Sequence, residues 1–176
     1  MTFFITGLPR SRTAWMAAFL TNGDVSCLHD GLRFLKSRDE FNTLMGEYTG
    51  LSDSGLVVTD FQRRFPNSKT VVIEREIEQC VSSLLTTFSE NGWDVNDEVA
   101  RESVVLLTIL QKGLKAVEGM RVPFQHLDSY MPDICDYIGV QYDERRHVMF
   151  QTLNIQTTDW VPRQEAYGLW SNNRIP

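Results

Sequence analysis

Short apolar runs rich in β-branched residues alternate along the chain with longer segments whose apolar residues recur at helical spacing. The short runs predict five strands, at residues 2–6, 25–28, 56–59, 70–73 and 122–127. The longer segments predict helices at residues 12–21, 38–49, 77–88, 96–118, 130–138 and 143–152. Because strands alternate with helices and no tight hairpin turn intervenes, the pattern predicts a three-layer α/β/α domain with a central parallel sheet of about five strands.

The chain has 176 residues, which suits a single domain over residues 1–176 with a sizeable core. The segment from about 154 to 176 is polar and aromatic, and we expect a loop there that closes over the functional site. The formal net charge of −6 argues against a general nucleic-acid binder, so no nucleic-acid partner is expected. A few arginines gathered in a cleft can still create a local positive potential.

The three cysteines, Cys27, Cys80 and Cys135, stand far apart and form no Cys-x-x-Cys or Cys/His cluster. This spacing argues against a disulfide framework or a structural zinc site and favours a reducing compartment, so we expect a cytoplasmic protein with no bound metal. Cys27 and Cys135 stand among apolar neighbours, which predicts buried thiols. No apolar run is long enough to span a bilayer, and the first residues lack the basic start of a signal peptide, so no membrane partner is expected.

The stretch from Phe3 to Trp15 carries the densest polar chemistry. An apolar run ends in Gly7, a helical pattern begins soon after, and the loop between them carries four polar side chains, those of Arg10, Ser11, Arg12 and Thr13. A loop that leads into a helix presents unpaired backbone N–H groups and the positive end of the helix dipole to an anion. Gly7 permits a turn that a side chain would obstruct. Guanidinium and hydroxyl donors suit phosphate or sulfate oxygens, so the stretch predicts an anion site.

This loop differs from the nucleoside-triphosphate loop G-x-x-x-x-G-K-[ST]. Gly7 stands at the first position, but three later positions differ: Arg12 replaces the second Gly, Thr13 the Lys, and Ala14 the hydroxyl that holds Mg²⁺. The run Thr6-Gly7-Leu8-Pro9-Arg10-Ser11-x-Thr13-x-Trp15 instead resembles the 5′-phosphosulfate loop of PAPS-dependent sulfotransferases, where PAPS is 3′-phosphoadenosine-5′-phosphosulfate. That family usually has Gly at the position of Arg12 and often a second Thr at that of Ala14.

The resemblance implies a P-loop-NTPase-like α/β fold, a small member of bacterial or phage type, and PAPS as the cofactor. It places the cofactor on the loop residues Gly7, Pro9, Arg10, Ser11, Arg12, Thr13, Ala14 and Trp15. The family uses an aromatic at the position of Trp15 to stack on adenine, whereas an aromatic at helical spacing equally fits a core position. The family also closes a basic C-terminal loop over the nucleotide, for which this chain offers Arg163, Tyr167 and Trp170.

A second stretch, from Phe65 to Leu84, is similar to the part of the same family that binds the cofactor's 3′-phosphate. That motif places an Arg at the end of a strand and a Ser eight residues later, as Arg75 and Ser83 are placed here. A helix that turns back from the strand end would bring Ser83 to the phosphate held by Arg75. A third stretch, residues 124–140, resembles the family's late strand, acidic turn and helix end, and it supports the fold rather than the chemistry.

Sulfuryl transfer, which the resemblance implies, needs positive donors on the leaving phosphate and a base that reaches the acceptor. Arg10 is our candidate for the first task. His29 is the first candidate for the base and Asp30 the second, because both directly follow a predicted strand, and Asp60 is the third. Ligands of open α/β sheets bind beyond the carboxyl ends of the strands, where all of these side chains should converge. His147 is expected at the surface.

The leading hypothesis is therefore a sulfotransferase-like enzyme that transfers a sulfuryl group from PAPS to a hydroxyl or amine of an unidentified acceptor. Its expected partners are the nucleotide and this acceptor, and a second subunit of a dimer could complete the acceptor side. One alternative is a divergent P-loop kinase acting on a nucleotide or small molecule, which requires Mg²⁺-ATP. Another is a catalytically silent nucleotide-binding protein of the same fold, for which the orientation of Arg12 is informative.

Overall fold

A parallel sheet forms the centre of the computed structural model, which describes residues 2–35 and 37–155. Within these residues, five strands pair in the order β2-β3-β1-β4-β5, and every pairing is parallel. The strands are β1 (Phe3–Gly7), β2 (Cys27–His29), β3 (Gly50–Ser52), β4 (Lys69–Glu74) and β5 (Met120–Pro123). All five carboxyl ends point to one edge, where open α/β sheets bind their ligands.

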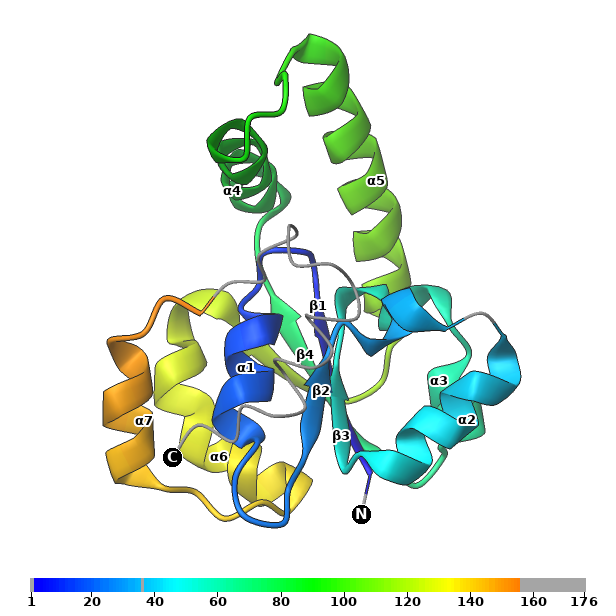
Figure 1. Ribbon diagram of the computed structural model, residues 1–176, viewed down its shortest axis with the longest axis vertical. Helices are drawn as coiled ribbons and strands as arrows, with labels where there is room; N and C mark the ends of the chain where they lie inside the picture. The colour runs from blue at the N-terminus through cyan, green and yellow to red at the C-terminus, as the bar shows by residue number, and fades with distance from the viewer. Residues whose placement is uncertain (1, 36, 156–176) are drawn as a thin grey trace.

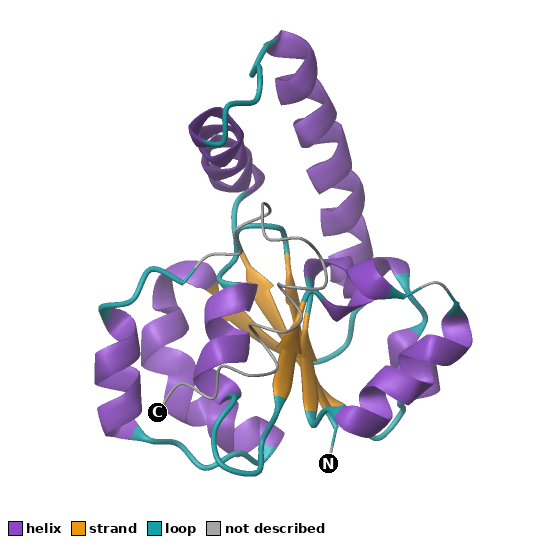
Figure 2. Ribbon diagram, in the orientation of Figure 1, coloured by secondary structure: helices purple, strands orange, loops and turns teal. Residues whose placement is uncertain are grey.

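Helices cover both faces of this sheet (Figures 1 and 2). One face carries α1 (Thr13–Leu20), α6 (Leu127–Ile138) and α7 (Glu144–Gln151), which pack on Phe3, Ile5 and the same side of β4. The other face carries α2 (Arg38–Glu47), α3 (Phe61–Arg64) and the lower half of α5 (Asp97–Ala116), which pack on Phe4 and Val72. The alternation of Phe3, Phe4 and Ile5 between the two cores follows from the two-residue period of a strand. The predicted α/β/α architecture is confirmed.

The connection between β4 and β5 rises away from the sheet as a helical hairpin. Helix α4 (Ile77–Glu90) leaves the carboxyl edge, and α5 runs back along α4 and then along one face of the sheet toward the start of β5 (Figure 1). Asn96 begins α5, since its side chain accepts the N–H groups of Glu98 and Val99. Both helices were predicted. The hairpin therefore forms a wall beside the end of β4.

The predicted strand at residues 56–59 is wrong. Residues Ser54–Val58 form the 3₁₀ helix η2, and the strand is the preceding segment Gly50–Ser52, which lies in none of the predicted strands or helices. The N–H of Asp53 bonds to the carbonyl of Ile5 at 3.0 Å, and its side chain then accepts the N–H of Gly55 at 2.7 Å, which turns the chain. Val58 is 73% exposed, so the apolar run that resembled a buried strand does not lie in one.

Other differences are smaller. The fifth strand ends at Pro123, and residues Phe124–His126 form the 3₁₀ helix η3, because α6 begins at Leu127, earlier than expected. A further 3₁₀ helix, η1 (Gly31–Phe34), follows β2, and neither it nor α3 was predicted. Cys27 and Cys135 are buried as expected, at 6% and 0% exposure. No helix in the described ranges is both long enough and apolar enough to cross a bilayer.

Candidate active site

A cavity of about 1550 Å³ opens at the carboxyl edge of the sheet. Loops after β1, β2, β3 and β4 form its floor, and α4 and α5 contribute Ser83, Leu84, Phe88 and Leu106 to its wall. Of the site residues that the sequence singled out within the described ranges, all line this cavity except Gly7 and Ser11. The set that lines it is Pro9, Arg10, Arg12, Thr13, Ala14, Trp15, His29, Asp30, Asp60, Arg75 and Ser83. The sheet therefore brings together residues that stand far apart in the sequence.

The loop after β1 has a backbone shape that few side chains favour. Arg10 (φ 72°) and Arg12 (φ 60°) both lie in the left-handed region, where Gly is the usual residue. Gly7 is required for space, because a Cβ there would stand 2.7 Å from the carbonyl oxygen of Ile73 on the neighbouring strand. Helix α1 begins directly after Arg12, so its first backbone N–H groups face the cavity end of the loop without partners in the helix.

Two hydrogen bonds join this loop to the second motif. Arg10 Nε donates to Ser83 Oγ on α4 at 3.1 Å, and Arg75, just beyond β4, donates from Nη1 to the carbonyl oxygen of Arg10. The Arg75 guanidinium also lies 4.0 Å from the ring centre of Phe124. Its Nε is buried and makes no hydrogen bond, and burial lowers the pKa of this side chain from its usual value. Arg10, Arg75 and Ser83 thus gather several potential anion donors at one end of the cavity.

Ser11 lies beneath the loop rather than in the cavity. Its side chain is fully buried next to the Cys80 thiol, and no hydrogen bond of ordinary geometry satisfies its hydroxyl. Burial raises the pKa of Cys80, so this thiol stays protonated and forms part of the packing below the loop. Ser11 thus supports the shape of the loop from inside the protein.

Trp15 occupies the core position that the sequence left open. Its ring is 1% exposed, its Nε1–H donates to the carbonyl of Phe150 at 2.9 Å, and the ring of Phe19 stacks nearly parallel to it. The guanidinium of Arg12 lies over the same ring, 4.3 Å from its centre. No face of Trp15 is free, so adenine can stack on it only if Arg12 moves away.

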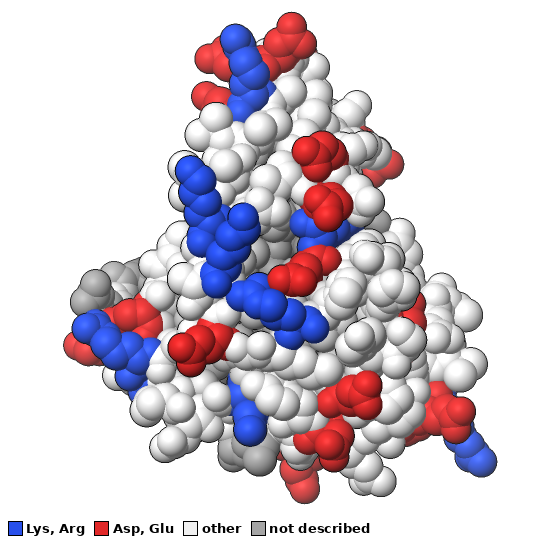
Figure 3. Space-filling view, turned by 180° about the vertical axis from the view of Figure 1, so that it is seen from behind, with Lys and Arg blue, Asp and Glu red and all other residues white. Residues whose placement is uncertain are grey.

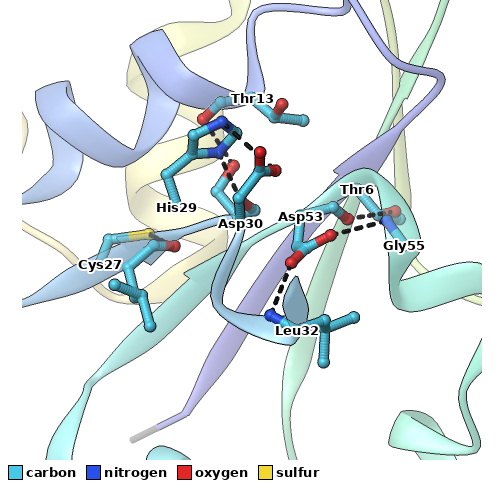
Figure 4. A network of polar contacts seen from close by, with 10 residues as sticks. Thr6, Thr13, Cys27, His29, Asp30, Leu32, Asp53 and Gly55 are labelled. Atoms are coloured by element: carbon cyan, nitrogen blue, oxygen red, sulfur yellow. Dashed lines mark hydrogen bonds and ion pairs between the residues drawn. The ribbon is translucent and has the colours of Figure 1, made fainter. Parts of the chain in front are cut away.

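Three titratable side chains meet at the ends of β2 and β3 (Figure 4). His29 is buried, and its Nδ1 lies 2.9 Å from the carbonyl oxygen of Ser52. Because a carbonyl only accepts, Nδ1 carries the proton there, and Nε2 faces Asp30 Oδ1 at 3.4 Å. Asp53 directly follows β3, the strand next to β2, and its carboxylate accepts the N–H groups of Leu32 and Gly55 at 3.0 and 2.7 Å.

Asp53 was missed in the sequence because the strand before it was placed six residues too late. Burial and the nearby charge of Asp30 raise its pKa to about 6, while the two N–H donors and His29 oppose this effect. A carboxylate with a pKa near neutrality, in a cavity wall, suits a general base. The available signal was the run Asp53-Ser54-Gly55, in which an Asp side chain can bond to the backbone two residues later.

Asp60, our third candidate base, lines the cavity but is engaged elsewhere. Its two carboxylate oxygens accept hydrogen bonds from Arg63 and Arg64, and these bonds hold its pKa well below the usual range. An acid this weakly basic is a poor proton acceptor at neutral pH. The arrangement therefore favours the group of His29, Asp30 and Asp53 over Asp60.

His147 is buried, so its predicted surface position is wrong. Its Nδ1 bonds to the hydroxyl of Tyr142 at 2.8 Å, and its Nε2 lies 3.5 Å from Asp128, whose carboxylate also accepts from Arg12. The tail residues Arg163, Tyr167 and Trp170 lie outside the described residues. In the part of the chain that the structure describes, no three metal-binding side chains gather in one place.

The charge distribution agrees with a local anion site on an acidic protein. Seen from behind, Lys and Arg side chains gather in a band at the foot of the α4–α5 hairpin, while acidic side chains surround it (Figure 3). The overall charge of −6 thus coexists with four arginines in the lining of the cavity, namely Arg10, Arg12, Arg64 and Arg75.

Comparison with known proteins identifies the type of fold. No family model matches the sequence, and no curated protein matches it either. Solved structures do match. A mouse sulfotransferase, SULT7A1 complexed with PAP, superposes with a TM-score of 0.60 and 12% identity over 85% of this chain. The chain has the sulfotransferase fold.

Two further structures support this result. A sulfotransferase from Alicyclobacillus acidocaldarius matches with a TM-score of 0.58 and 10% identity over 98% of this chain and 92% of its own length. The sulfotransferase domain from the curacin biosynthetic pathway matches with a TM-score of 0.51 and 9% identity over 89% of this chain and 80% of its own. The chain spans only 62% of the length of the mouse protein. Identities this low establish the shared fold and leave the activity to the residues of the site.

Proposed function

We propose that the protein is a sulfotransferase that moves a sulfuryl group from PAPS to a hydroxyl or amine of a second ligand. The observation that carries the proposal is the junction of the two motifs. Arg10 of the loop bonds to Ser83, and Arg75 bonds to the backbone of Arg10, across 73 and 65 residues of sequence. Either motif alone is a common surface feature, whereas their meeting in one cavity makes a site with several anion donors.

The residues present fit such a donor. Arg75, with a buried Nε that lacks a partner, and Ser83 would hold the 3′-phosphate, and Arg10 with the N–H groups at the start of α1 would hold the 5′ end. PAPS supplies an activated sulfuryl group on a phosphate leaving group. Arg10 would stabilise the charge that develops on that phosphate, a task that Mg²⁺ performs in triphosphate loops. Thr13, the first residue of α1, adds a hydroxyl at the same place.

The acceptor would enter over β2 and β3. Asp53 lies near the ends of these strands and has a pKa raised to about 6, so it would take the proton of the acceptor. His29 and Asp30 would position the acceptor. The cavity also contains apolar side chains from five elements or their flanks, namely Leu32, Leu35, Phe41, Val58, Leu84, Phe88 and Leu106. This lining suits an acceptor with an apolar body. The volume exceeds the few hundred to about 1,000 Å³ of a typical single-ligand pocket, which leaves room for two ligands.

Thermal unfolding tests the donor site. The ligands are PAP (adenosine 3′,5′-bisphosphate, the desulfated donor), ADP and Mg²⁺-ATP, each with wild type, Arg75→Ala and the control Arg145→Ala. Arg145 is an exposed arginine of α7 outside the cavity. A ligand at 100 times its dissociation constant adds about 2.7 kcal/mol to the stability. We expect PAP without metal to stabilise wild type and Arg145→Ala and to have little effect on Arg75→Ala.

Other outcomes would identify the alternatives. Stabilisation by Mg²⁺-ATP alone would refute the sulfotransferase and favour a kinase. Stabilisation by PAP without sulfate transfer to any of a panel of alcohols and amines would favour a silent nucleotide-binding protein. No stabilisation by any of the three ligands would refute nucleotide binding at this cavity.

A further inference from the structure

Arg12 stands where the resemblance leads us to expect Gly, and its side chain has an unusual environment. Its backbone is left-handed (φ 60°) at the residue that precedes α1, and its side chain caps no helix N–H. The guanidinium instead lies 4.3 Å above the ring centre of Trp15. Its Nη1 donates to both carboxylate oxygens of Asp128 on α6, at 3.2 and 3.1 Å. The contacts with Trp15 and Asp128 therefore hold the side chain of Arg12 in one orientation.

Aromatic rings surround Trp15, the side chain beneath Arg12. Phe19 lies parallel to Trp15, with ring centres 5.4 Å apart, and Phe150 and His147 meet the same ring edge-on. Trp15 borders the cavity but is only 1% exposed, so it offers almost no surface to a ligand. The layer that reaches the cavity is the guanidinium of Arg12, whose side chain keeps 26% of its surface exposed. A planar guanidinium is itself a good stacking partner for a flat aromatic ring.

The end of α7 borders the cavity beside Arg12. Gln151, the last residue of α7, and residues 152–155 line the cavity together with Arg12 and Trp15, and they begin one residue after Phe150, whose carbonyl holds the indole N–H. Polar backbone and the side chains of Gln151 and Asn154 stand along this stretch. A flat heterocycle with polar edges suits this lining, with one face on a cation and its edge toward hydrogen-bonding groups.

We propose that Arg12 is the platform on which the nucleobase of the donor stacks, and that Asp128 is a positioning residue that keeps the guanidinium over the ring of Trp15. The inference rests on the proposed function for the nucleotide, and it replaces Trp15 by Arg12 as the surface that touches the base. Arg12 thus contacts the nucleobase, whereas Arg10, Arg75 and Ser83 hold the phosphates.

Isothermal titration with PAP tests this role with two substitutions of Arg12. Arg12→Gly removes the side chain and keeps a residue that favours the left-handed backbone. Arg12→Lys keeps the positive charge and loses the plane. Stacking on a base contributes on the order of 1–3 kcal/mol, so we expect both variants to bind PAP about tenfold more weakly than wild type. Ser11 and the rest of the loop are untouched, and thermal unfolding without ligand shows whether each variant is folded.

The outcomes separate three roles of Arg12. If it contacts a phosphate, Arg12→Lys regains most of the affinity while Arg12→Gly loses it, which overturns the proposal. If it only covers Trp15, Arg12→Gly binds PAP more tightly, since adenine then reaches the indole, and the proposal is again overturned. Unchanged affinity in both variants overturns it too. Absence of PAP binding to the wild type would instead contradict the proposed function itself.

Two further readouts address the base and Asp128. Uridine 3′,5′-bisphosphate carries the same phosphates on a smaller ring, so wild type should prefer PAP, and this preference should largely vanish in Arg12→Gly. Asp128→Asn should weaken PAP binding by about threefold in the wild type and by nothing further in Arg12→Gly, because it acts through Arg12. A preference for PAP that persists in Arg12→Gly, or equal effects of Asp128→Asn in both backgrounds, would contradict the assignment.

Discussion

Asp53→Asn tests the electrostatics of the acceptor side most directly. Asp53 is 3% exposed, and its pKa is raised from an ordinary 3.8 to about 6 by burial and by the charge of Asp30. The asparagine has nearly the same shape but never ionises. It keeps one oxygen to accept an N–H group, whereas the carboxylate accepts from both Leu32 and Gly55.

The sign and size follow from proton linkage. Between pH 3.8 and about 6 the unfolded chain has lost the proton of Asp53 while the folded chain keeps it, so the stability of the wild type falls as pH rises through this window. At 1.36 kcal/mol per pH unit, the loss from this group is on the order of 3 kcal/mol. Asp53→Asn lacks this loss. Its own fixed cost is one weakened hydrogen bond, about 1–3 kcal/mol at every pH.

Urea unfolding of both proteins from pH 4.5 to 8 measures the difference. We expect Asp53→Asn to be the less stable protein at pH 4.5 and to approach or exceed the wild type at pH 8. The difference between the two curves cancels the titrating groups that do not interact with Asp53, including Asp60, whose lowered pKa acts at more acidic pH. A difference that stays constant across the range would refute a raised pKa at Asp53.

The same variant separates a base from a structural side chain. As general base, Asp53 should contribute about 10²–10⁴-fold to the rate of sulfate transfer, without changing PAP affinity. Asp30→Asn is the matched control, since it removes the neighbouring charge that helps to raise the pKa of Asp53. In that variant the acidic limb of the pH–rate profile should move to lower pH. An Asp53→Asn enzyme with normal turnover would assign Asp53 to folding alone.

Three other substitutions test the loop, the anion site and the acceptor wall. Ser83→Ala should weaken PAP binding about fivefold in titration calorimetry while changing the melting temperature little, because it removes one partner of Arg10. Gly7→Ala should cost about 1–3 kcal/mol in urea unfolding, since its Cβ meets a carbonyl at 2.7 Å; an unchanged midpoint would contradict that crowding. Leu106→Ser should raise the KM for an apolar alcohol such as 2-naphthol about tenfold, whereas Ile109→Ser, equally exposed on α5 but outside the cavity, should not.

The strand-loop-helix setting of the proposed anion loop was predictable because its signals are local. Gly7, Arg10 and Thr13 lie within seven residues, between a β-branched run and a helical pattern, and each of these signals is read without tertiary information. Arg75 and Ser83 were named through the resemblance to a family, whose motif places them at a strand end and two turns along the following helix. Arg10 was named from its own guanidinium group, but its hydrogen bonds with Ser83 and Arg75 join residues 73 and 65 positions apart and required the structure.

The place of Asp53 at the end of a strand and the core position of Trp15 could be established only from the structure. Strand β3 has three residues and no alternating pattern, while the apolar run at 56–59 has the composition of a strand but turns as η2, with Val57 packed against Gly113 on α5. That contact joins residues 56 positions apart, so no local pattern contains it. Trp15 could equally have faced a ligand or the core, and the carbonyl of Phe150, 135 residues away, decides for the core.

The left-handed arginines explain how the loop holds its shape before a ligand arrives. A non-glycine residue in that region costs about 1–2 kcal/mol, and such strain persists only where the surroundings hold it. Arg10 is held by Ser83 of α4 and, through its carbonyl, by Arg75, and Arg12 is held by Asp128 of α6. The side chains to which we assign the phosphates and the nucleobase of the donor therefore also take part in the contacts that fix the backbone of the loop. A ligand that binds there meets donors already in position, which lowers the entropy that binding must spend on ordering them.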